Sequence, residues 1–210
     1  MTTLNNNQNK DRDRPTVKNW DQYYRENEVE NMPWFAEHFD HDFDTTIKTL
    51  ENTNVNALDL GTGPGTQAIH LAKKGFHVTA VDISQAAIDS ATLRAQKEGV
   101  TIHLEQDDVR QSHLTGCFDL IIDRGCFHSL TPENRPVYAK MIQDRLTETG
   151  SLLLKCFSTQ EPGTEGPNRF SKEMILEVFS PFLKNITISD SEFRSKRPTN
   201  PKALYCVMRK

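Results

Sequence analysis

Long apolar runs and an excess of positive charge are both absent from this sequence of 210 residues. No segment approaches the ~18 to 20 consecutive apolar residues that a transmembrane helix needs. The first residues are polar and lack the apolar centre of a signal peptide, so we expect a cytoplasmic protein. The formal net charge of -4 disfavours a nucleic-acid partner, because clustered Lys and Arg normally drive phosphate binding.

Cysteine motifs are absent as well. Cys117, Cys126, Cys156 and Cys206 form no C-x-x-C pair and have no spacing typical of a zinc site, so no metal is expected. Three of them lie in or beside apolar runs, which predicts reduced and mostly buried thiols. The 36% hydrophobic content suffices for one substantial core in a chain of this length, so a single catalytic domain is the expectation.

The most informative stretch that is present runs Asp-Leu-Gly-Thr-Gly-Pro-Gly over residues 59–65. It follows an apolar run and precedes a helical pattern. Because glycine has no Cβ, glycines at alternate positions let the backbone turn sharply and lie against a ligand. A second apolar run, residues 78–81, ends at Asp82, where a carboxylate could hold a ribose. Strand, glycine turn, helix, strand and acid together predict a nucleoside-binding unit.

The glycine spacing distinguishes this unit from a dinucleotide site. Dinucleotide folds use G-x-G-x-x-G to place a pyrophosphate at a helix N-terminus. This chain has G-x-G-x-G directly after Asp59, whose carboxylate would repel a phosphate but suits a ligand with a cationic end. S-adenosylmethionine carries an ammonium, a sulfonium and an adenosine. Over roughly residues 16–210 the sequence resembles the class I S-adenosylmethionine-dependent methyltransferases.

The resemblance implies a role for several acids at strand ends. The glycine turn would wrap the methionine part of the cofactor S-adenosyl-L-methionine, with Asp59 near its amino group. Asp82 would bind the ribose hydroxyls, and Asp108 matches the adenine-recognising position, although Asp107 and Asp108 could equally be solvated turn acids. The complete set of expected cofactor-binding residues is Asp59, Gly61, Thr62, Gly63, Gly65, Asp82, Ile83, Asp108, Val109, Asp123, Trp20 and Tyr24.

Alternating strand and helix patterns predict an α/β fold. Apolar runs near 55–60, 77–82, 101–105, 117–123 and 150–157 are expected to be strands with helices in the intervals. Ser84 and Ser171 are expected to cap two helices. Two more strands, near 184–190 and 203–208, have no helix between them and predict an antiparallel hairpin at one sheet edge. The resemblance implies a Rossmann-like, seven-stranded, mostly parallel sheet of order 3-2-1-4-5-7-6 with the last strand antiparallel and helices on both faces.

Three segments are expected along the chain. Residues 1–14 are polar and predict a flexible tail. Residues 15–52 predict an N-terminal helical lid segment, whose aromatic rings would favour the sulfonium of the cofactor. Ordinary packing of helices on the core explains the same aromatics equally well. Residues 53–210 are the expected S-adenosylmethionine-binding methyltransferase domain.

The fourth predicted strand ends in Asp-Arg-Gly-Cys-Phe-His over residues 123–128. It contains no N-P-P-Y or D-P-P-Y, which disfavours the enzymes that methylate amino groups of DNA and glutamine. With the upstream W-x-x-Y-Y at residues 20–24, this string resembles the thiopurine and tellurite-resistance methyltransferase group. The resemblance implies a small-molecule acceptor.

Methyl transfer from a sulfonium is an in-line displacement, so the enzyme mainly positions the nucleophile and excludes water. An ionised sulfur, selenium or tellurium acceptor needs no general base, whereas a neutral oxygen or nitrogen benefits from one. His128 and Asp123 are the candidate catalytic residues. Their alternatives are packing for His128 and orientation for Asp123. Trp34, Phe127 and Arg124 are the expected substrate contacts.

The predicted function is therefore methyl transfer to a small molecule through an S, Se, Te, N or O nucleophile, with release of S-adenosylhomocysteine. A monomer is the default expectation. The alternatives are a methyltransferase acting on protein or RNA, a nicotinamide-dependent oxidoreductase, and a non-catalytic cofactor-binding protein. The glycine spacing and the lack of a Tyr-x-x-x-Lys proton donor near the fourth strand disfavour the oxidoreductase.

Overall fold

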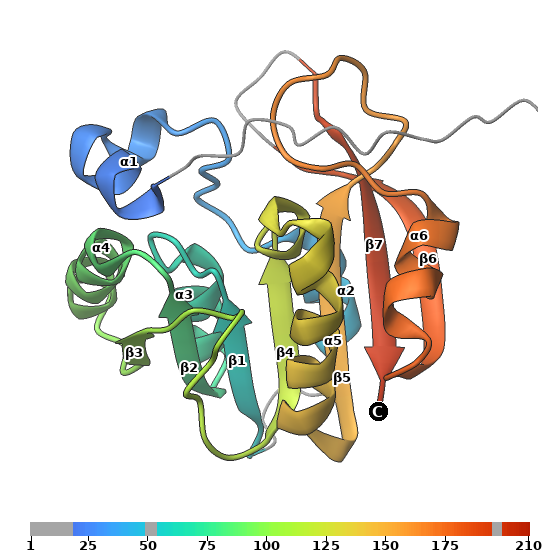
Figure 1. Ribbon diagram of the computed structural model, residues 1–210. Coiled ribbons are helices and arrows are strands. Elements are labelled where there is room, and N and C mark those ends of the chain that lie inside the picture. Colours follow the sequence, from blue (N-terminus) through green and yellow to red (C-terminus); the bar gives the residue numbers. More distant parts are fainter. Residues whose placement is uncertain (1–18, 49–53, 195–198) are drawn as a thin grey trace, which may run out of the picture.

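The computed structural model describes residues 19–48, 54–194 and 199–210, and the predicted tail lies outside them. Seven strands form one sheet in the predicted order β3-β2-β1-β4-β5-β7-β6 (Figure 1). The first five are parallel, and β7 is antiparallel to both of its neighbours. The strands are β1 (Asn56–Leu60), β2 (His77–Asp82), β3 (His103–Gln106), β4 (Phe118–Arg124), β5 (Leu146–Phe157), β6 (Lys184–Glu192) and β7 (Lys202–Arg209).

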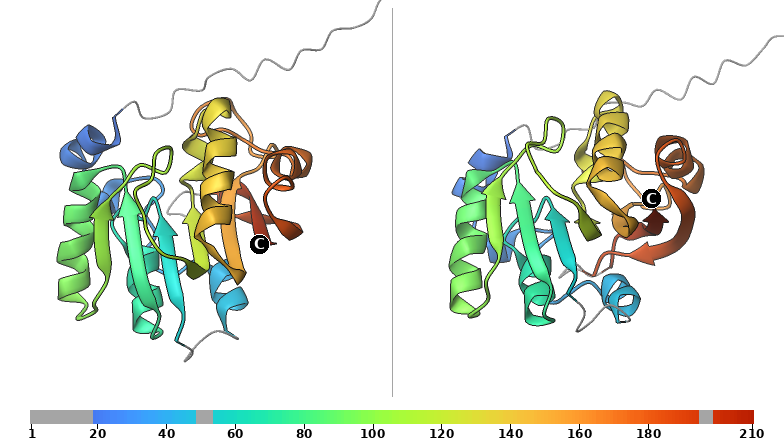
Figure 2. Two further views of the ribbon diagram at one scale, coloured as in Figure 1. Left: turned by 60° about the horizontal axis from the view of Figure 1, so that its bottom comes forward. Right: turned by 90° about the horizontal axis from the view of Figure 1, so that it is seen from below.

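Helices cover both faces of the sheet (Figure 2). On one face lie α2 (His41–Ile47) and α3 (Thr66–Lys73), with α4 (Gln85–Lys97) against β2 and β3. On the other lie α5 (Arg135–Arg145) and α6 (Lys172–Phe179). The predicted caps are confirmed, because Ser84 accepts from the Ala87 amide and Ser171 from the Met174 amide. The short elements are α1 (Trp20–Glu26), η1 (Val29–Asn31), η2 (Phe127–Ser129) and η3 (Pro132–Asn134).

The expectation of a helix in every interval is wrong between β3 and β4. Residues 107–117 form an irregular loop, and Val109 and Leu114 are its only aliphatic side chains. Two such residues are too few for the apolar stripe of a packed helix. The adjacent sheet face is polar, with Thr79 and His103 side by side, so it offers a helix little to pack against. A solvent-open groove of about 590 Å³ lies there instead.

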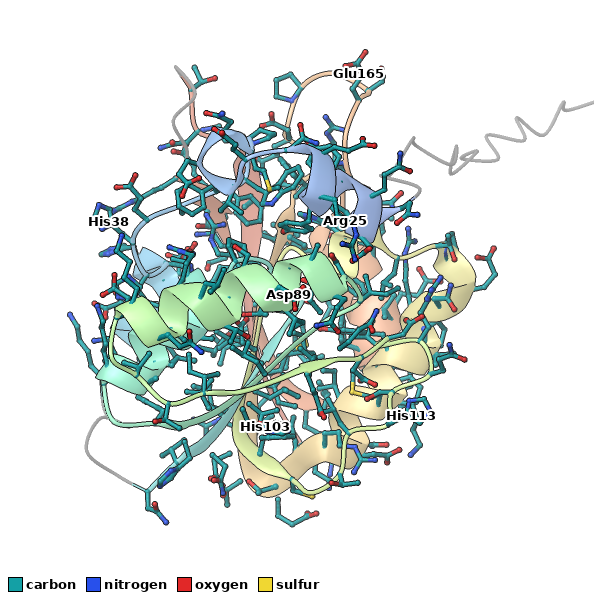
Figure 3. All side chains as sticks on the ribbon, turned by 90° about the vertical axis from the view of Figure 1, so that its left-hand side faces the viewer. Arg25, His38, Asp89, His103, His113 and Glu165 are labelled. Atoms are coloured by element: carbon teal, nitrogen blue, oxygen red, sulfur yellow. The ribbon has the colours of Figure 1, made fainter. Side chains whose placement is uncertain are left out.

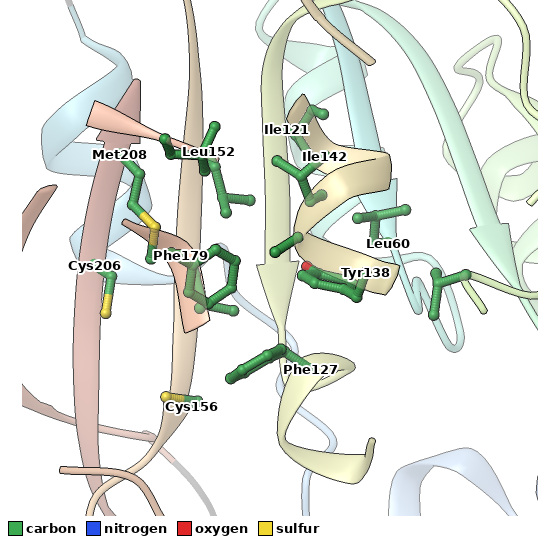
Figure 4. Close-up of a cluster of buried hydrophobic side chains, with 14 of the residues drawn as sticks. Leu60, Ile121, Phe127, Tyr138, Ile142, Leu152, Cys156, Phe179, Cys206 and Met208 are labelled. Atoms are coloured by element: carbon green, nitrogen blue, oxygen red, sulfur yellow. The ribbon is translucent and has the colours of Figure 1, made fainter. Parts of the chain in front are cut away.

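The larger hydrophobic core lies between the sheet and the helices α5 and α6 (Figure 4). Tyr138 of α5 is its largest fully buried side chain, and its hydroxyl donates to Asp123 Oδ2 at 2.7 Å. Cys156 and Cys206 are free and buried, which confirms the prediction for these two thiols, whereas Cys117 is exposed. The Tyr138 hydrogen bond therefore ties this core to the end of β4.

We expect Tyr138→Phe to lower the free energy of unfolding by about 1–2 kcal/mol, because it leaves a buried carboxylate oxygen without its hydroxyl donor. Chemical denaturation measures the change. Tyr205→Phe is the matched control, since it also removes one hydroxyl contact, to Thr46, at a partly buried position. A loss at Tyr138 no larger than the loss at Tyr205 would contradict the expectation.

Candidate cofactor and acceptor site

Three buried aspartates stand at the carboxyl ends of three neighbouring strands. Asp59 lies near the end of β1, Asp82 at the end of β2 and Asp123 near the end of β4, and their exposed fractions are 2%, 7% and 0%. Loss of hydration raises the pKa of Asp59 to about 7 and those of Asp82 and Asp123 to about 6. The other two carboxylates raise the pKa of Asp59 further. This end of the sheet therefore favours a cationic ligand.

Hydrogen bonds from the following turns hold two of these carboxylates. Asp82 Oδ1 accepts from the Ser84 amide, and Oδ2 accepts from the Gly63 amide, both at 2.9 Å. Asp59 Oδ2 accepts from the Thr62 hydroxyl at 2.6 Å. The second contact of Asp82 reaches across to the glycine turn of β1, so Asp82 joins the two strand ends that the sequence assigned to one nucleoside site.

Asp123 is fully committed to the turn after its own strand. Oδ1 accepts from the Gly125 and Cys126 amides at 2.9 and 2.8 Å. Oδ2 accepts from the Phe127 amide at 2.9 Å and from the Tyr138 hydroxyl at 2.7 Å. Four donors and complete burial favour the orienting alternative for Asp123 over proton abstraction.

The glycine turn after β1 contains glycine at three alternate positions and so presents backbone atoms without Cβ groups there. Gly61 and Gly63 have φ of 63° and 53°, a region that residues with a Cβ rarely adopt. A Cβ on Gly61 would lie 2.7 Å from Cys126 Cβ, and one on Gly63 would lie 2.7 Å from the Tyr24 hydroxyl. Gly65, with φ 77°, is the N-cap of α3. Both the backbone conformation of this turn and its tight packing against Cys126 and Tyr24 therefore require glycine at positions 61 and 63.

The aromatic residues of the N-terminal segment gather beside this turn. Trp20, Tyr23, Tyr24 and Trp34 pack on one another with ring centroids 5.2–6.5 Å apart. The Trp34 indole donates to the Tyr24 hydroxyl at 3.4 Å. No residue of α1 is fully buried. By contrast, α2 buries Phe43 and Ile47 in the core and is part of the packed domain. Among the described helices of the expected lid segment, only α1 and η1 could therefore move as a lid.

A small cavity of about 60 Å³ remains between these aromatics and the glycine turn. Small-molecule sites typically measure ~300–1,000 Å³, so the volume of this cavity is smaller than that of a site able to hold such a ligand. Five predicted cofactor residues (Tyr24, Asp59, Gly61, Thr62 and Gly63) line it together with the predicted acceptor residues Trp34 and Arg124. The other predicted cofactor residues do not line this cavity: Trp20, Gly65, Asp82, Ile83, Asp108, Val109 and Asp123.

The predicted adenine end contains an alternative to Asp108. Arg110 binds both oxygens of Asp108 at 2.6–3.0 Å and keeps the pKa of that carboxyl below its usual value. Asp107 is buried, and its Oδ2 has no hydrogen-bond partner among the described residues. Ile83 is 39% exposed beside Asp82, and Val109 is buried. The orphaned oxygen favours Asp107, rather than the expected Asp108, as the acceptor for an amino group.

His128 is buried behind the expected acceptor side. Its Nδ1 accepts from the Phe157 amide at 3.3 Å, and its ring packs against Phe157 and Phe193. Burial, with Arg124 nearby, lowers the pKa of His128 to about 3, so the imidazole is neutral and its other nitrogen carries the proton. The backbone oxygen of His128 accepts from Asn168, which ties the loop of residues 158–168 in place. These contacts favour packing over general-base catalysis.

A buried ionic cluster lies at the ends of β4 and β5. Lys155 Nζ is 2.8 Å from Asp40 Oδ1 and 2.7 Å from Asp42 Oδ2, and its side chain is 2% exposed. Arg124 Nε is 2.9 Å from Asp40 Oδ2. The cluster links α2 to the sheet. Sequence reasoning missed it because Arg124 and Lys155 are 84 and 115 positions from Asp40, and a lysine within the apolar run of β5 was the available signal.

Phe127 is not a substrate contact in this arrangement. Its side chain points into the core rather than into the site, with 0% solvent exposure, and its ring contacts Tyr138, Phe170 and Phe179 (Figure 4). The Phe127 amide donates to Asp123 Oδ2 and its ring is packed among three aromatic rings, so an acceptor contact at Phe127 would require this packing to open. Trp34 and Arg124 do line the cavity.

Comparisons with known proteins agree with this geometry. A profile described as "Methyltransferase domain" matches residues 57–150. Human EEF1A lysine methyltransferase 2 is 31% identical over 191 residues, covering 79% of this chain and 78% of that protein. The chain belongs to the class I S-adenosylmethionine-dependent methyltransferases, and S-adenosylmethionine is its cofactor.

Solved structures show the same fold. TehB from Haemophilus influenzae superimposes with a TM-score of 0.68 at 19% identity, covering 82% of this chain and 62% of that chain. A structure from work on "Conversion of a Disulfide Bond into a Thioacetal Group during Echinomycin Biosynthesis" gives a TM-score of 0.78 at 22% identity, covering 90% and 91%. Within the described ranges, no helix has the length and apolar character to cross a bilayer.

We expect the affinity for S-adenosylmethionine to fall as the pH drops below about 7. The pKa of Asp59 is about 7, and the cofactor's ammonium favours the ionised carboxylate. Binding below that pH releases a proton, so the Kd rises by up to about tenfold per pH unit. Calorimetry at pH 6, 7 and 8 measures the slope. Asp59→Asn should flatten it, and a flat profile in the unaltered protein would contradict the role of Asp59.

Gly63→Ala should weaken cofactor binding by more than about tenfold, because the new Cβ adds a clash to a strained φ. Gly75→Ala is the matched control: Gly75 also has positive φ, but nothing lies within 4 Å of the position that its new methyl group would take. Equilibrium binding of S-adenosylhomocysteine compares the two variants. Equal losses would show that backbone strain alone accounts for the effect.

Proposed function

We propose that this methyltransferase acts on a small molecule whose acceptor atom is a soft, already ionised nucleophile such as a thiolate, selenolate or tellurium anion. When bound, the cofactor supplies an electrophilic methyl group on its sulfonium and leaves as S-adenosylhomocysteine. The observation that supports the proposal is that Asp123, His128 and Asp40, the side chains near the ends of β4 and β5 that could act as bases, are already held by hydrogen bonds or ion pairs.

None of the three candidate bases Asp123, His128 and Asp40 has an unoccupied acceptor atom facing the cavity, and Asp59 is assigned to the cofactor's ammonium. Asp123 accepts four hydrogen bonds, and Nδ1 of His128 is occupied by a backbone amide. Asp40 is paired with both Lys155 and Arg124. A neutral amine or hydroxyl acceptor benefits from a base, whereas an ionised sulfur needs none. The chain's task is then to orient the acceptor and exclude water.

The rim of the site also favours a small acceptor. Arg124 donates to the Trp34 carbonyl at 3.3 Å and to the Arg194 carbonyl at 3.4 Å, in addition to its pairing with Asp40. It thereby joins the N-terminal segment, β4 and the end of the β6–β7 hairpin. The N-terminal segment lies at the end of the sheet toward which the parallel strands point (Figure 1). A protein substrate that entered between these segments would have to break the contacts of Arg124.

Aromatic side chains supply the surface against which such an acceptor would lie. The Phe193 ring lies 5.1 Å from the Arg124 guanidinium carbon and 5.6 Å from Lys155 Nζ. Phe157 packs 5.2 Å from the same ring. Phe193 is buried and Phe157 is half-buried beside the charged cluster, so an acceptor with a flat, apolar body would have to reach Phe157 past Trp34 and Arg124, which line the cavity.

Protein lysine methylation is the second candidate, because the human relative named for that activity matches 79% of this chain. A lysine acceptor must lose its proton before transfer. Asp40 and Asp42 could receive it only if they were released from Lys155.

The test supplies purified protein and S-adenosylmethionine with matched acceptors: an aromatic thiol, its selenol, the corresponding phenol and aniline, and a lysine-rich protein extract. Release of S-adenosylhomocysteine is the readout. We expect turnover with the thiol and selenol, at a rate that rises with pH through the pKa of the acceptor. Labelling confined to a protein lysine would establish the second candidate instead.

His128→Asn should keep kcat within about threefold, because Asn can still accept from the Phe157 amide. The pH–rate profile should show no step near 6.5 from His128, whose pKa is about 3 and which is therefore neutral throughout the working range. A loss of two orders of magnitude in kcat with unchanged cofactor affinity would restore His128 as a catalytic base.

A further inference from the structure

The carboxylate of Asp21, on α1, accepts hydrogen bonds from the N-terminus of a different helix, α4. Asp21 Oδ1, on α1, accepts from the Ala86 amide at 2.9 Å and from the Ser84 hydroxyl at 3.2 Å, across 65 and 63 positions of sequence. Both donors lie at the N-terminus of α4, whose own cap is Ser84. Figure 3 shows α1, marked by Arg25, above α4, marked by Asp89. A negative charge at this end of a helix is favourable.

Further hydrogen bonds connect Ser84 to the predicted ribose site. The Ser84 amide donates to Asp82 Oδ1, and the Gly63 amide donates to Asp82 Oδ2, both at 2.9 Å. Hydrogen bonds therefore run from Asp21 through Ser84 and Asp82 to the glycine turn. The same turn touches α1 a second time, because the position of a Gly63 Cβ lies 2.7 Å from the Tyr24 hydroxyl.

α1 is held by few interactions other than these. It contains no fully buried residue, and its rings pack mainly on one another. The cavity of about 60 Å³ at the glycine turn is bounded on the α1 side by Tyr24 and, after α1, by Trp34, and it is smaller than the ~300 Å³ or more of ordinary sites. A ligand at the glycine turn would therefore displace these side chains, and a docking point for α1 would fix where Tyr24 returns.

We propose that Asp21 is that docking point: a positioning residue that seats α1 on α4, so that closing Tyr24 and Trp34 over the cofactor and fixing Asp82 against its ribose occur together. This goes beyond the proposed acceptor chemistry and does not depend on it, because cofactor binding can be measured without an acceptor. The Ala86 amide, followed by Arg25, lowers the pKa of Asp21, so the carboxylate stays charged at neutral pH.

The chain provides its own reporter for the position of α1. It contains two tryptophans, Trp20 and Trp34, and both belong to the aromatic cluster on α1 and the segment after it. Quenching of intrinsic fluorescence by acrylamide therefore reports on this cluster alone. In the unaltered full-length protein, S-adenosylhomocysteine should reduce the quenching.

The experiment compares Asp21→Ala, Asp21→Asn and Arg25→Ala by calorimetry with S-adenosylhomocysteine and by acrylamide quenching. Asp21→Ala should weaken binding about tenfold and leave the tryptophans open to quencher in the presence of ligand. Asp21→Asn keeps an oxygen at the acceptor position and should stay within about threefold. Arg25→Ala removes the partner of Asp21 Oδ2, 2.8 Å away, and spares the α4 contact, so it should bind nearly as the unaltered protein does.

Three outcomes would overturn the proposal. The first is normal binding and normal protection of the tryptophans in Asp21→Ala. The second is an equal loss in Arg25→Ala, because Asp21 would then act within α1. The third is loss of the folded core in Asp21→Ala, seen by circular dichroism, because a surface-docked helix should detach without unfolding the sheet. Failure of every acceptor in the turnover assay would leave these binding results unaffected.

Discussion

The structure depends on three carboxylates gathered out of water at the ends of adjacent parallel strands. Asp59, Asp82 and Asp123 would repel one another if nothing compensated them. Backbone amides and hydroxyls supply that compensation, and in doing so they fix the turns that follow β1, β2 and β4. The three buried negative charges therefore have two effects: they order the loops that donate hydrogen bonds to them, and they favour a positively charged ligand.

On the acceptor side, buried charges are compensated by opposite charges rather than by backbone amides and hydroxyls. There Lys155 and Arg124 meet Asp40 and Asp42, and the cluster is balanced internally. Because its positive and negative side chains already neutralise one another, this cluster attracts neither a cation nor an anion strongly. One end of the site favours a cation, and under the proposal above the acceptor would bring its own charge to the other end.

Local patterns in the sequence predicted the glycine turn and the caps at Ser84 and Ser171, because these depend on neighbouring residues. The strand order came from the resemblance to the methyltransferase family, and the structure confirms it. Features set by distant residues were missed. The pairing of Lys155 with Asp40 spans 115 positions, and the Phe127 ring is buried against Phe170 and Phe179, which lie 43 and 52 positions further along the chain. The missing helix after β3 was visible in principle, since residues 107–117 contain two aliphatic side chains, but alternation along the rest of the chain suggested otherwise.

Because that helix is missing, the β3 edge of the sheet is covered by a helix on one face only. The strand β3 is a short edge strand with α4 behind it and the polar groove in front. Such a strand buries little area, so opening it exposes less apolar surface than opening any central strand. The loop carrying Asp107 therefore follows an edge strand whose amide hydrogens should exchange more readily than those of the central strands, and a ligand that engages this loop would protect that edge of the sheet.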